Sequence, residues 1–230
     1  MIGDLADSGF GGLAEFVTAP EKALAIKPSK VSFDAAATLP VAAITALNAL
    51  RDKGRIKKGQ NVLIVGSAGG VGTFAVQLAK YYGAVVTAVC STKNIKQTLS
   101  LGADKVIDYT NEDFTESEVR FDLILAINGN YPLLAYRRLL KSNGTYVMVG
   151  GAMNQIFKSM FFGWILSSGG RRMKVLSGKT RPEDLEFVAN LLNDGKIRPV
   201  ISNEYSLDNA VEAMVFLGKG HASGKLIINV

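Results

Sequence analysis

The sequence of 230 residues predicts an α/β fold, a doubly wound parallel sheet, with a small partial β region formed by both chain ends. Three observations predict it. Short, wholly apolar segments recur from residue 62 onward, as expected of strands that are buried on both faces. Segments with apolar residues at helical spacing separate them. A glycine-rich turn joins the first of these strands to the first helix.

Composition narrows the class of protein. Hydrophobic residues make up 48% of the chain and charged residues 20%, which is typical of a globular protein and excludes a disordered one. No run of about 18 apolar residues is present, so no membrane-spanning helix is expected. Cys90 is the single cysteine, and the first residues lack the pattern of a secretory signal. Both features predict a reducing, cytoplasmic location. The net charge of +6 admits anionic partners without identifying one.

The first part of the chain lacks the strand-helix alternation. Residues 13–18 alternate like a half-buried strand, and residues 23–26 predict a second strand that ends at Lys27. Ser32 is placed to cap a helix, because its hydroxyl can accept a hydrogen bond from an N–H group of the first turn. Pro40 is expected to interrupt this helix, and a second helix is predicted from residue 41 to 51.

From residue 62 the alternation is regular. The pattern predicts strands at 62–65, 85–90, 105–108, 121–127, 145–149 and 173–176. Helices are predicted at 71–82, 94–101 and 131–140, the first two ended by Gly83 and Gly102. Further helices at 182–192 and 207–217 accompany strands at 199–201 and 225–230. The terminal strand is expected to join the β segments at 13–26, which would bring the two chain ends together.

The turn after the strand at 62–65 has the composition of a phosphate-binding loop. Four glycines fall within the seven residues from Gly66 to Gly72. A strand, a glycine turn and a helix in this order aim the N–H groups of the helix at an anion, and glycine permits close approach of the backbone. Ser67 stands where the first glycine of G-x-G-x-x-G is expected, so a glycine turn without a ligand remains an alternative. The candidate binding residues here are Ser67, Ala68, Gly69, Gly70 and Val71.

The end of the strand at 85–90 indicates which dinucleotide the turn would bind. An NAD site usually has an acidic residue about 20 residues past the glycines, which bonds the ribose 2′-hydroxyl. Residues 90–94 contain no Asp or Glu, whereas Ser91 offers a hydroxyl and Lys93 a cation. This pair suits the 2′-phosphate of NADP. A polar turn with no role in binding is the alternative.

Seven stretches carry a resemblance to a known family: residues 11–16, 39–46, 66–72, 90–94, 101–109, 144–151 and 220–225. Together they resemble the zinc-independent quinone oxidoreductase branch of the medium-chain dehydrogenase/reductase superfamily, which also contains the zinc alcohol dehydrogenases. The resemblance spans nearly the whole chain. It implies a Rossmann dinucleotide-binding domain at 41–198, and a remnant of the GroES-like catalytic domain at 1–40 and 199–230. Most of that catalytic domain would precede residue 1, so both a truncation and a natural short form remain open.

The resemblance implies an enzyme that transfers hydride from NADPH to a small apolar quinone or α,β-unsaturated carbonyl, without zinc. No cysteine occurs at Pro40 to Ala43, where the last zinc ligand of the alcohol dehydrogenases would fall. The family also implies cofactor contacts for Thr45, Tyr109, Asn128, Val149, Gly150 and Lys225. Ala126 replaces an aspartate that is usual in the family, which weakens the expectation for Asn128. The substrate-side proton donor would lie before residue 1, so no catalytic residue is named.

Other interpretations of the chain remain. A non-catalytic NADP(H)-binding protein is the main alternative. Arg171 and Arg172 raise nucleic-acid binding as a third, although no nucleic acid is expected. A homodimer is predicted through the edge strand between Met173 and Leu176. The aromatic segment at 156–166 is a core or subunit contact, a substrate lid or an interfacial membrane contact.

The single histidine and the single cysteine complete the list of candidates. His221 is expected in a structural or exposed role rather than as an acid-base group, because glycines bound its turn. Cys90 is expected to be a packed residue at the end of a strand. One cysteine and one histidine are too few for an ordinary zinc site.

Overall fold

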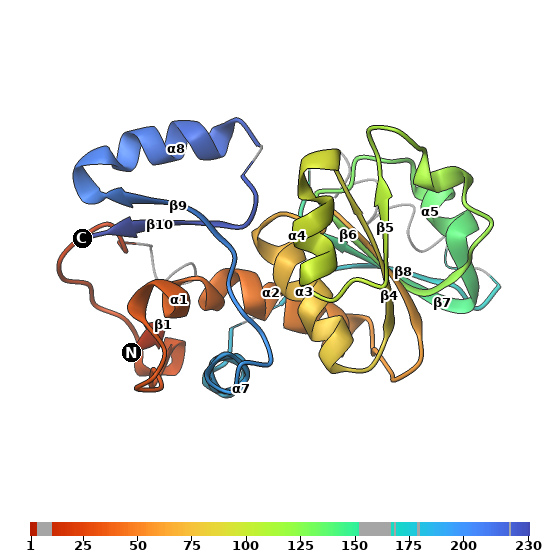
Figure 1. The fold of residues 1–230 in the computed structure, drawn as a ribbon. Helices are drawn as coiled ribbons and strands as arrows, with labels where there is room; N and C mark the ends of the chain where they lie inside the picture. The colour runs from red at the N-terminus through yellow and green to blue at the C-terminus, as the bar shows by residue number, and fades with distance from the viewer. Residues whose placement is uncertain (4–10, 152–166, 168, 179, 221) are drawn as a thin grey trace. The chain divides into compact units, whose positions relative to one another are not determined.

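A computed structural model describes residues 1–3, 11–151, 167, 169–178, 180–220 and 222–230 (Figure 1). The aromatic segment at 156–166, with its three alternative roles, and His221 lie outside the described residues. The chain divides into two compact units. The chain-end unit comprises Met1–Ile44, Gly69–Phe74 and Lys179–Val230, and the sheet unit comprises Thr45–Ala68 and Ala75–Gly178.

The sheet unit contains a six-stranded sheet in the order β5-β4-β3-β6-β7-β8, in which every pair of neighbours is parallel. The strands are β3 (Asn61–Val65), β4 (Val85–Cys90), β5 (Lys105–Asp108), β6 (Phe121–Ile127), β7 (Leu140–Val149) and β8 (Arg172–Val175). Strand order reverses on either side of β3, which confirms the doubly wound sheet. In such a sheet all strands end at one edge, and ligands bind beyond that edge at the point of reversal.

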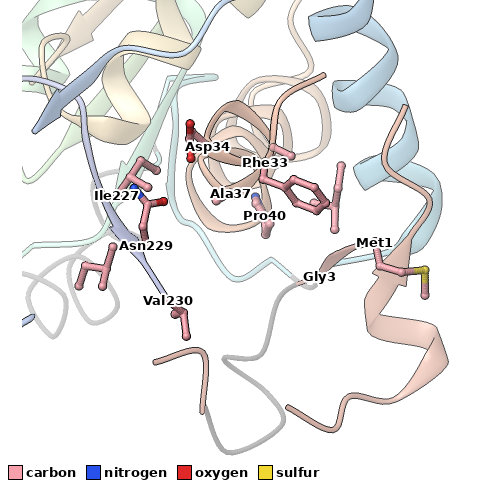
Figure 2. A pocket seen from close by; sticks show the side chains of 12 residues that line it. Met1, Gly3, Phe33, Asp34, Ala37, Pro40, Ile227, Asn229 and Val230 are labelled. Carbon is pink, nitrogen blue, oxygen red and sulfur yellow. The ribbon is translucent and has the colours of Figure 1, made fainter. Parts of the chain in front are cut away.

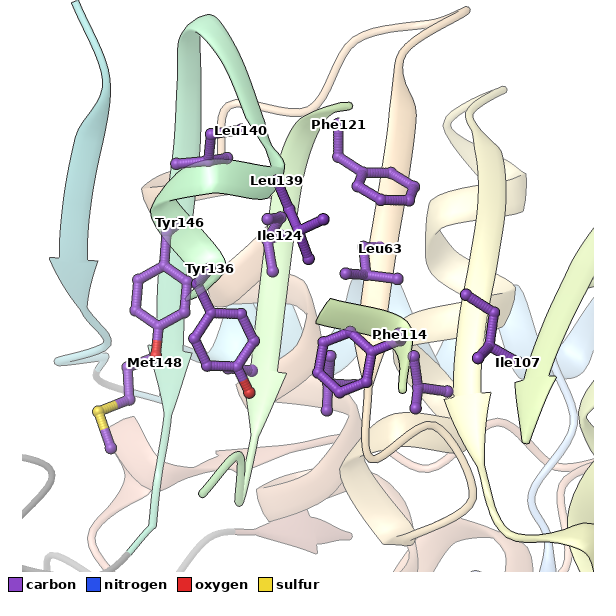
Figure 3. Packing of buried hydrophobic residues seen from close by; sticks show 13 residues of the cluster. Leu63, Ile107, Phe114, Phe121, Ile124, Tyr136, Leu139, Leu140, Tyr146 and Met148 are labelled. Carbon is purple, nitrogen blue, oxygen red and sulfur yellow. The ribbon is translucent and has the colours of Figure 1, made fainter. Parts of the chain in front are cut away.

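Both faces of this sheet are buried. Leu63 and Ile64 are neighbours in β3 and point to opposite faces, and neither is exposed to solvent. One face packs against α5 (Leu133–Leu139) and the short helix η6 (Phe114–Glu116) in a cluster that includes Phe121 and Tyr136 (Figure 3). The remaining helices of this alternation are α3 (Gly70–Tyr81), η5 (Thr92–Asn94) and α4 (Ile95–Ser100). Gly83 and Gly102 follow α3 and α4 with φ of 76° and 102°, as glycine at a helix end predicts.

Strand β7 differs most from the sequence expectation. It begins at Leu140, directly after α5, instead of at residue 145. Phe121 pairs with Leu140 and Leu123 pairs with Thr145, so residues 141–144 form an irregularity in the pairing. Asn143 there has a φ of 67°. The sequence pattern identified only the regular part of the strand, because a bulge interrupts the period of two.

The helical run from Phe33 to Lys53 also differs from its expectation. Ser32 caps α1 (Phe33–Ala37) as predicted, since its Oγ accepts a hydrogen bond from Ala35 N at 3.2 Å. Pro40 does not interrupt the run. It lies at the start of a π-helical stretch (Leu39–Ala43), which α2 (Ile44–Leu47) and a second π stretch (Asn48–Lys53) follow. Pro40 lies in the first turn of this stretch, where a backbone nitrogen has no partner within the stretch and the missing N–H therefore costs little.

This run passes a length and composition test for a membrane span, as no other helix among the described residues does. In its most apolar window, 67% is buried inside the structure. Core helices of globular proteins pass the same test, so the helix is weak evidence for a membrane span.

The chain-end unit contains two small sheets instead of one β region. Strand β1 (Ile2–Gly3) pairs antiparallel with β2 (Leu24–Ala25). Strand β10 (Lys225–Asn229) pairs parallel with β9 (Ile201–Ser206). The prediction that the terminal strand joins residues 13–26 is therefore wrong. Residues 13–18 form no strand, and Phe16 is 90% exposed. A strand needs a partner for its backbone groups, which local alternation cannot supply.

Helix α8 (Ala210–Gly218) and the short helix η7 (Leu207–Asn209) connect β9 to β10, so these elements form a βαβ unit. Residues of both chain ends nevertheless line one cavity of about 450 Å³ (Figure 2). It is lined by Met1, Ile2, Gly3, Phe33, Asp34, Ala36, Ala37, Pro40, Ile227, Ile228, Asn229 and Val230.

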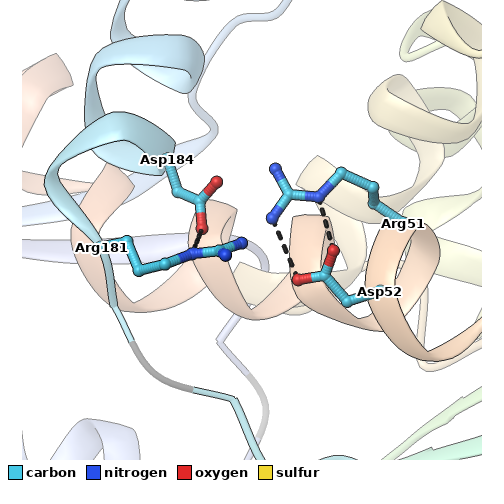
Figure 4. A network of polar contacts seen from close by, with 4 residues as sticks. All are labelled: Arg51, Asp52, Arg181 and Asp184. Atoms are coloured by element: carbon cyan, nitrogen blue, oxygen red, sulfur yellow. Dashed lines mark hydrogen bonds and ion pairs between the residues drawn. The ribbon is translucent and has the colours of Figure 1, made fainter.

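Helix α7 (Pro182–Asn193) supplies much of the core of the chain-end unit. It packs against β2 and the π stretch at Leu39–Ala43. The side chain of Asp184 lies in its first turn, buried, and accepts a hydrogen bond from Arg181 Nε at 2.9 Å (Figure 4). Figure 4 also draws the pair in the sheet unit between Arg51 Nε and Asp52 Oδ1, at 2.6 Å.

Candidate functional site

The carboxyl edge of the parallel sheet brings together most of the predicted binding residues of the sheet unit. Each follows or ends a strand: Ser67 and Ala68 after β3, Ser91 and Lys93 after β4, Tyr109 after β5, Asn128 after β6, and Val149 and Gly150 at the end of β7. Because all six strands are parallel, these positions share one edge. Thr45 is the exception in this unit, since it lies half-buried within α2.

The turn after β3 is held by its backbone. The N–H groups of Gly66 and Ser67 donate to the carbonyl of Val89 in β4, at 3.2 and 3.1 Å. The hydroxyl of Ser67 donates to the same oxygen at 3.1 Å, and the side chain is fully buried. Ser67 therefore stabilises the turn through its side chain. Gly66 has a φ of 80°, and a Cβ there would lie 2.3 Å from the carbonyl oxygen of Ile127. Only glycine fits this position.

In the chain-end unit, the first turn of α3 presents its amide groups. The first helical hydrogen bond runs from Thr73 N to the carbonyl of Gly69, at 2.9 Å. The N–H groups of Gly70, Val71 and Gly72 precede it, at the end of the helix that carries positive partial charge. This arrangement favours an anion.

Lys225 lies against this glycine segment. Gly69 forms a parallel bridge with Gly224, and a Cβ on Gly70 would lie 2.7 Å from Cδ of Lys225. Burial lowers the pKa of the Lys225 ammonium. Its Nζ has no hydrogen bond or ion pair with any residue that the structure describes. An anion beside it would offset the cost of burial.

The end of β4 forms a short turn, η5. Asn94 is buried and ties the turn to its first residue: its N donates to the carbonyl of Ser91 at 2.9 Å, and its Nδ2 to the hydroxyl of Ser91 at 3.1 Å. Lys93 is exposed in the middle of the turn. Cys90 precedes the turn and is buried, with its Sγ accepting a hydrogen bond from Thr98 at 3.6 Å. Burial raises the pKa of the Cys90 thiol, so it is a packed residue, as predicted.

Asp108, the last residue of β5, was missed by the sequence analysis. Its carboxylate is buried and accepts hydrogen bonds from Thr92, Thr110 and Asn111. These bonds, led by that of the Thr92 hydroxyl, hold the pKa of Asp108 below its ordinary value although burial raises it. A signal was present, because Asp followed two residues later by Thr is a common turn sequence in which the aspartate bonds its own backbone.

The ends of β6 and β7 lie together. The backbone N of Asn128 donates to the carbonyl of Val149 at 3.2 Å, and Asn128 has a φ of 52°. A Cβ on Gly150, whose φ is 67°, would lie 3.9 Å from Oδ1 of Asn128. Ala126, where an aspartate is usual in the family that the sequence resembles, is fully buried in the core. The structure therefore brings Asn128, Val149 and Gly150 into one small group.

Comparison with known proteins identifies the family. A model of the family described as "Zinc-binding dehydrogenase" matches residues 101–228. The chain belongs to this family. The "Chloroplast envelope quinone oxidoreductase homolog" of Arabidopsis thaliana is 34% identical over 237 residues, covering 99% of this chain and 71% of the relative. The "2-methylene-furan-3-one reductase" of Solanum lycopersicum is 35% identical and covers 96% of this chain.

The solved structures agree. The "quinone oxidoreductase from Coxiella burnetii" has a TM-score of 0.83 and 33% identity, over 92% of this chain. The resemblance to the quinone oxidoreductase branch of the medium-chain dehydrogenase/reductase superfamily is confirmed. Other relatives are named as oxidoreductases that use a nicotinamide cofactor, among them the "NADPH-dependent alkenal/one oxidoreductase, chloroplastic" of Arabidopsis thaliana. The chain spans 53% of the tomato reductase and 65% of the Coxiella structure.

Proposed function

We propose that this dehydrogenase-family chain forms the cofactor-binding part of an NADPH-dependent reductase of quinones or α,β-unsaturated carbonyls. The observation that carries the proposal is the end of β4. It places a hydroxyl at Ser91 and a cation at Lys93, with no acidic residue among residues 90–94. An NAD site usually has a carboxylate there, whereas a cation is suited to a 2′-phosphate.

The residues fit a bound dinucleotide in three respects. A side chain at Gly66 would clash with the backbone, the first turn of α3 carries the positive partial charge of a helix N-terminus, and the half-buried Lys225 has no hydrogen bond or ion pair with the residues that the structure describes. Each feature is typical of an anion site. We propose cofactor contacts for Ser67 and Ala68 in the sheet unit and, in the chain-end unit, for Gly69, Gly70, Val71 and Lys225.

The bound nicotinamide would supply the hydride, and the chain would orient it. We propose that Asn128, Val149 and Gly150 contact the nicotinamide end, with Thr45 on its phosphate side and Tyr109 on the adenosine end. We propose that the protein acts without zinc, since no cysteine occurs at Pro40 to Ala43, where the last zinc ligand of the alcohol dehydrogenases would fall. No proton donor is assigned within this chain.

Two further proposals concern assembly and location. Strand β8 is an edge of the sheet, and we propose that a homodimer forms by pairing two copies of it. Light scattering that shows a monomer at high concentration would reject this. We propose a cytoplasmic location from the single, reduced cysteine, although several relatives are described as chloroplastic or mitochondrial. Microscopy of the tagged full-length protein tests it.

The first experiment titrates NADPH and NADH into the purified chain by fluorescence. We expect NADPH to bind more tightly than NADH. Lys93→Ala is expected to raise the dissociation constant of NADPH about tenfold or more, because a lost bond to a charged group costs about 1.5–3 kcal/mol. The dissociation constant of NADH is expected to stay unchanged. Lys105→Ala is the matched control, since this exposed lysine begins β5 at the opposite edge. No binding of either cofactor would overturn the proposal.

A second experiment adds a small quinone to the NADPH complex and follows the loss of NADPH absorbance. Oxidation supports a reductase. Binding without oxidation of any quinone or enone favours the alternative, a non-catalytic NADP(H)-binding protein. Salt-dependent retention of RNA that NADPH competes away would instead favour nucleic-acid binding.

A further inference from the structure

The carboxylate of Asp108 accepts four hydrogen bonds at the carboxyl edge of the sheet. Oδ1 accepts from Thr110 N at 3.0 Å and from Thr110 Oγ1 at 2.7 Å. Oδ2 accepts from Thr92 Oγ1 at 2.5 Å and from Asn111 Nδ2 at 2.8 Å. An ionised carboxylate has about four acceptor sites. All four are therefore occupied by the protein itself.

Because its acceptor sites are all occupied, Asp108 differs from the acidic residue of an NAD site. The latter follows the second strand and keeps an oxygen available for the ribose 2′-hydroxyl. Asp108 is the last residue of β5, the third strand in chain order from β3. It is buried and has no acceptor site left for a ligand. Its carboxylate therefore accepts hydrogen bonds from protein groups and leaves no oxygen for a cofactor hydroxyl.

The donor from Thr92 links two loops. Thr92 belongs to η5, and Asp108 and Thr110 lie at and after the end of β5. The hydroxyl of Thr92 also lies 2.8 Å from that of Thr110. Backbone bonding supports the same junction, because Tyr109 N donates to the carbonyl of Cys90 at 3.1 Å. Each of the two hydroxyls has one proton, and both donate it to Asp108, so the side chain of Thr92 is held by its bond to that carboxylate.

Thr92 stands between the two residues proposed to recognise the 2′-phosphate. Ser91 is held from the other side by Asn94. These bonds restrain the backbone from Ser91 to Asn94, and with it the position from which the Lys93 side chain leaves the turn. A binding group held in place before the ligand arrives loses less entropy on binding.

We propose that Asp108 is a positioning residue that fixes the turn at residues 91–94 through Thr92, and thereby makes the site selective for NADPH over NADH. The inference rests on the proposed cofactor function. It assigns no contact between Asp108 and the cofactor. NADH lacks the 2′-phosphate, so loosening the turn affects the binding of NADPH more than that of NADH.

The test compares three variants with the wild type. Asp108→Asn replaces an acceptor oxygen by an NH₂ group that faces donors, and Thr92→Val removes one donor at an exposed position where folding is not at risk. Both are expected to raise the dissociation constant of NADPH about tenfold and to leave that of NADH within about twofold. Thr92→Ser keeps the hydroxyl and is expected to restore NADPH binding.

Asp104→Asn is the matched control. Asp104 precedes β5 at its other end and also accepts hydrogen bonds, from Val86 N at 2.7 Å and Lys80 Nζ at 2.8 Å. Its loss is expected to lower the thermal midpoint without changing the ratio of the two dissociation constants. If Thr92→Val weakens both cofactors equally, or neither, the inference is overturned while the proposed function stands. A wild type that binds neither cofactor, or prefers NADH, overturns both.

Discussion

The sheet unit and the chain-end unit are built on different principles. In β3 and β6 nearly every residue is buried, because helices cover both faces of the sheet. In β9 and β10 most residues are half-buried or exposed. Helix α8 is also poorly buried: its sequence is strongly apolar, but its residue Val211 is 76% exposed. In the sheet unit, the residues that are buried can be recognised from local apolar runs. In the chain-end unit, burial depends on which segments, distant in the sequence, pack against each other.

The largest expected effect contrasts two phenylalanines. Phe121 is 2% exposed in the sheet core, and Phe16 is 90% exposed in the chain-end unit. Phe121→Ala is expected to lower the free energy of unfolding by about 3–5 kcal/mol, because it leaves a cavity. Phe16→Ala is expected to stay within about 0.5 kcal/mol. Urea denaturation measures both, and equal effects would contradict the contrast.

Two glycines sharpen the comparison within the sheet unit. Gly66 and Gly59 both have a φ of 80°, but a Cβ would meet Ile127 O at 2.3 Å at Gly66 and nothing within 4 Å at Gly59. Gly59→Ala is expected to cost about 1–2 kcal/mol for the backbone conformation alone. Gly66→Ala is expected to cost about 1–3 kcal/mol more, from the clash. Thermal denaturation of the two variants separates the cost of the backbone conformation from the cost of the clash. Similar losses of unfolding free energy in both variants would show that the turn at Gly66 relaxes.

A smaller effect is expected at the cap of α1 in the chain-end unit. Ser32→Ala removes the acceptor for Ala35 N and is expected to cost about 1 kcal/mol of unfolding free energy. Ser32→Asp keeps an acceptor at the cap and is expected to recover most of it. The same denaturation curves provide the measurement. If both variants behaved like the wild type, the cap would not contribute to stability.

The smallest expected effect depends on pH. Burial raises the pKa of Asp104, but bonds from Lys80 and Val86 N and the charge of Lys80 outweigh it, so the pKa lies below its ordinary value. A lowered native pKa stabilises the fold above the unfolded value of about 4, and this stability is lost as pH falls through the native value.

The wild type should therefore exceed Asp104→Asn in stability at neutral pH, by no more than about 1 kcal/mol because solvent screens the pair with Lys80. The difference should shrink as pH falls below about 4. Guanidinium titrations at several pH values test this. If the difference in unfolding free energy between the two proteins grew as pH fell, the pKa of Asp104 would be raised instead of lowered.

The candidate site was predictable in outline from the sequence. Strand ends and the glycine turn follow from local composition, so the positions of Ser91, Lys93, Tyr109 and Gly150 at one edge could be inferred. The roles of individual side chains could not. Ser67 was expected at a ligand, but its hydroxyl bonds Val89. Asp108 was not considered, although it holds the neighbouring turn.

By itself the sequence determined the parallel sheet, the order of its strands along the chain, the helix ends at Gly83 and Gly102, and the absence of an acid after β4. Each of these features depends on a short stretch of sequence, in which the spacing of apolar residues, the helix caps and the turn residues act locally. Only the tertiary structure decided that β10 pairs with β9, that residues 13–18 form no strand, and that Lys225 lies against Gly70. Such pairings join residues far apart in the chain, and the free energy that selects them comes from burial and hydrogen bonds that no local window contains.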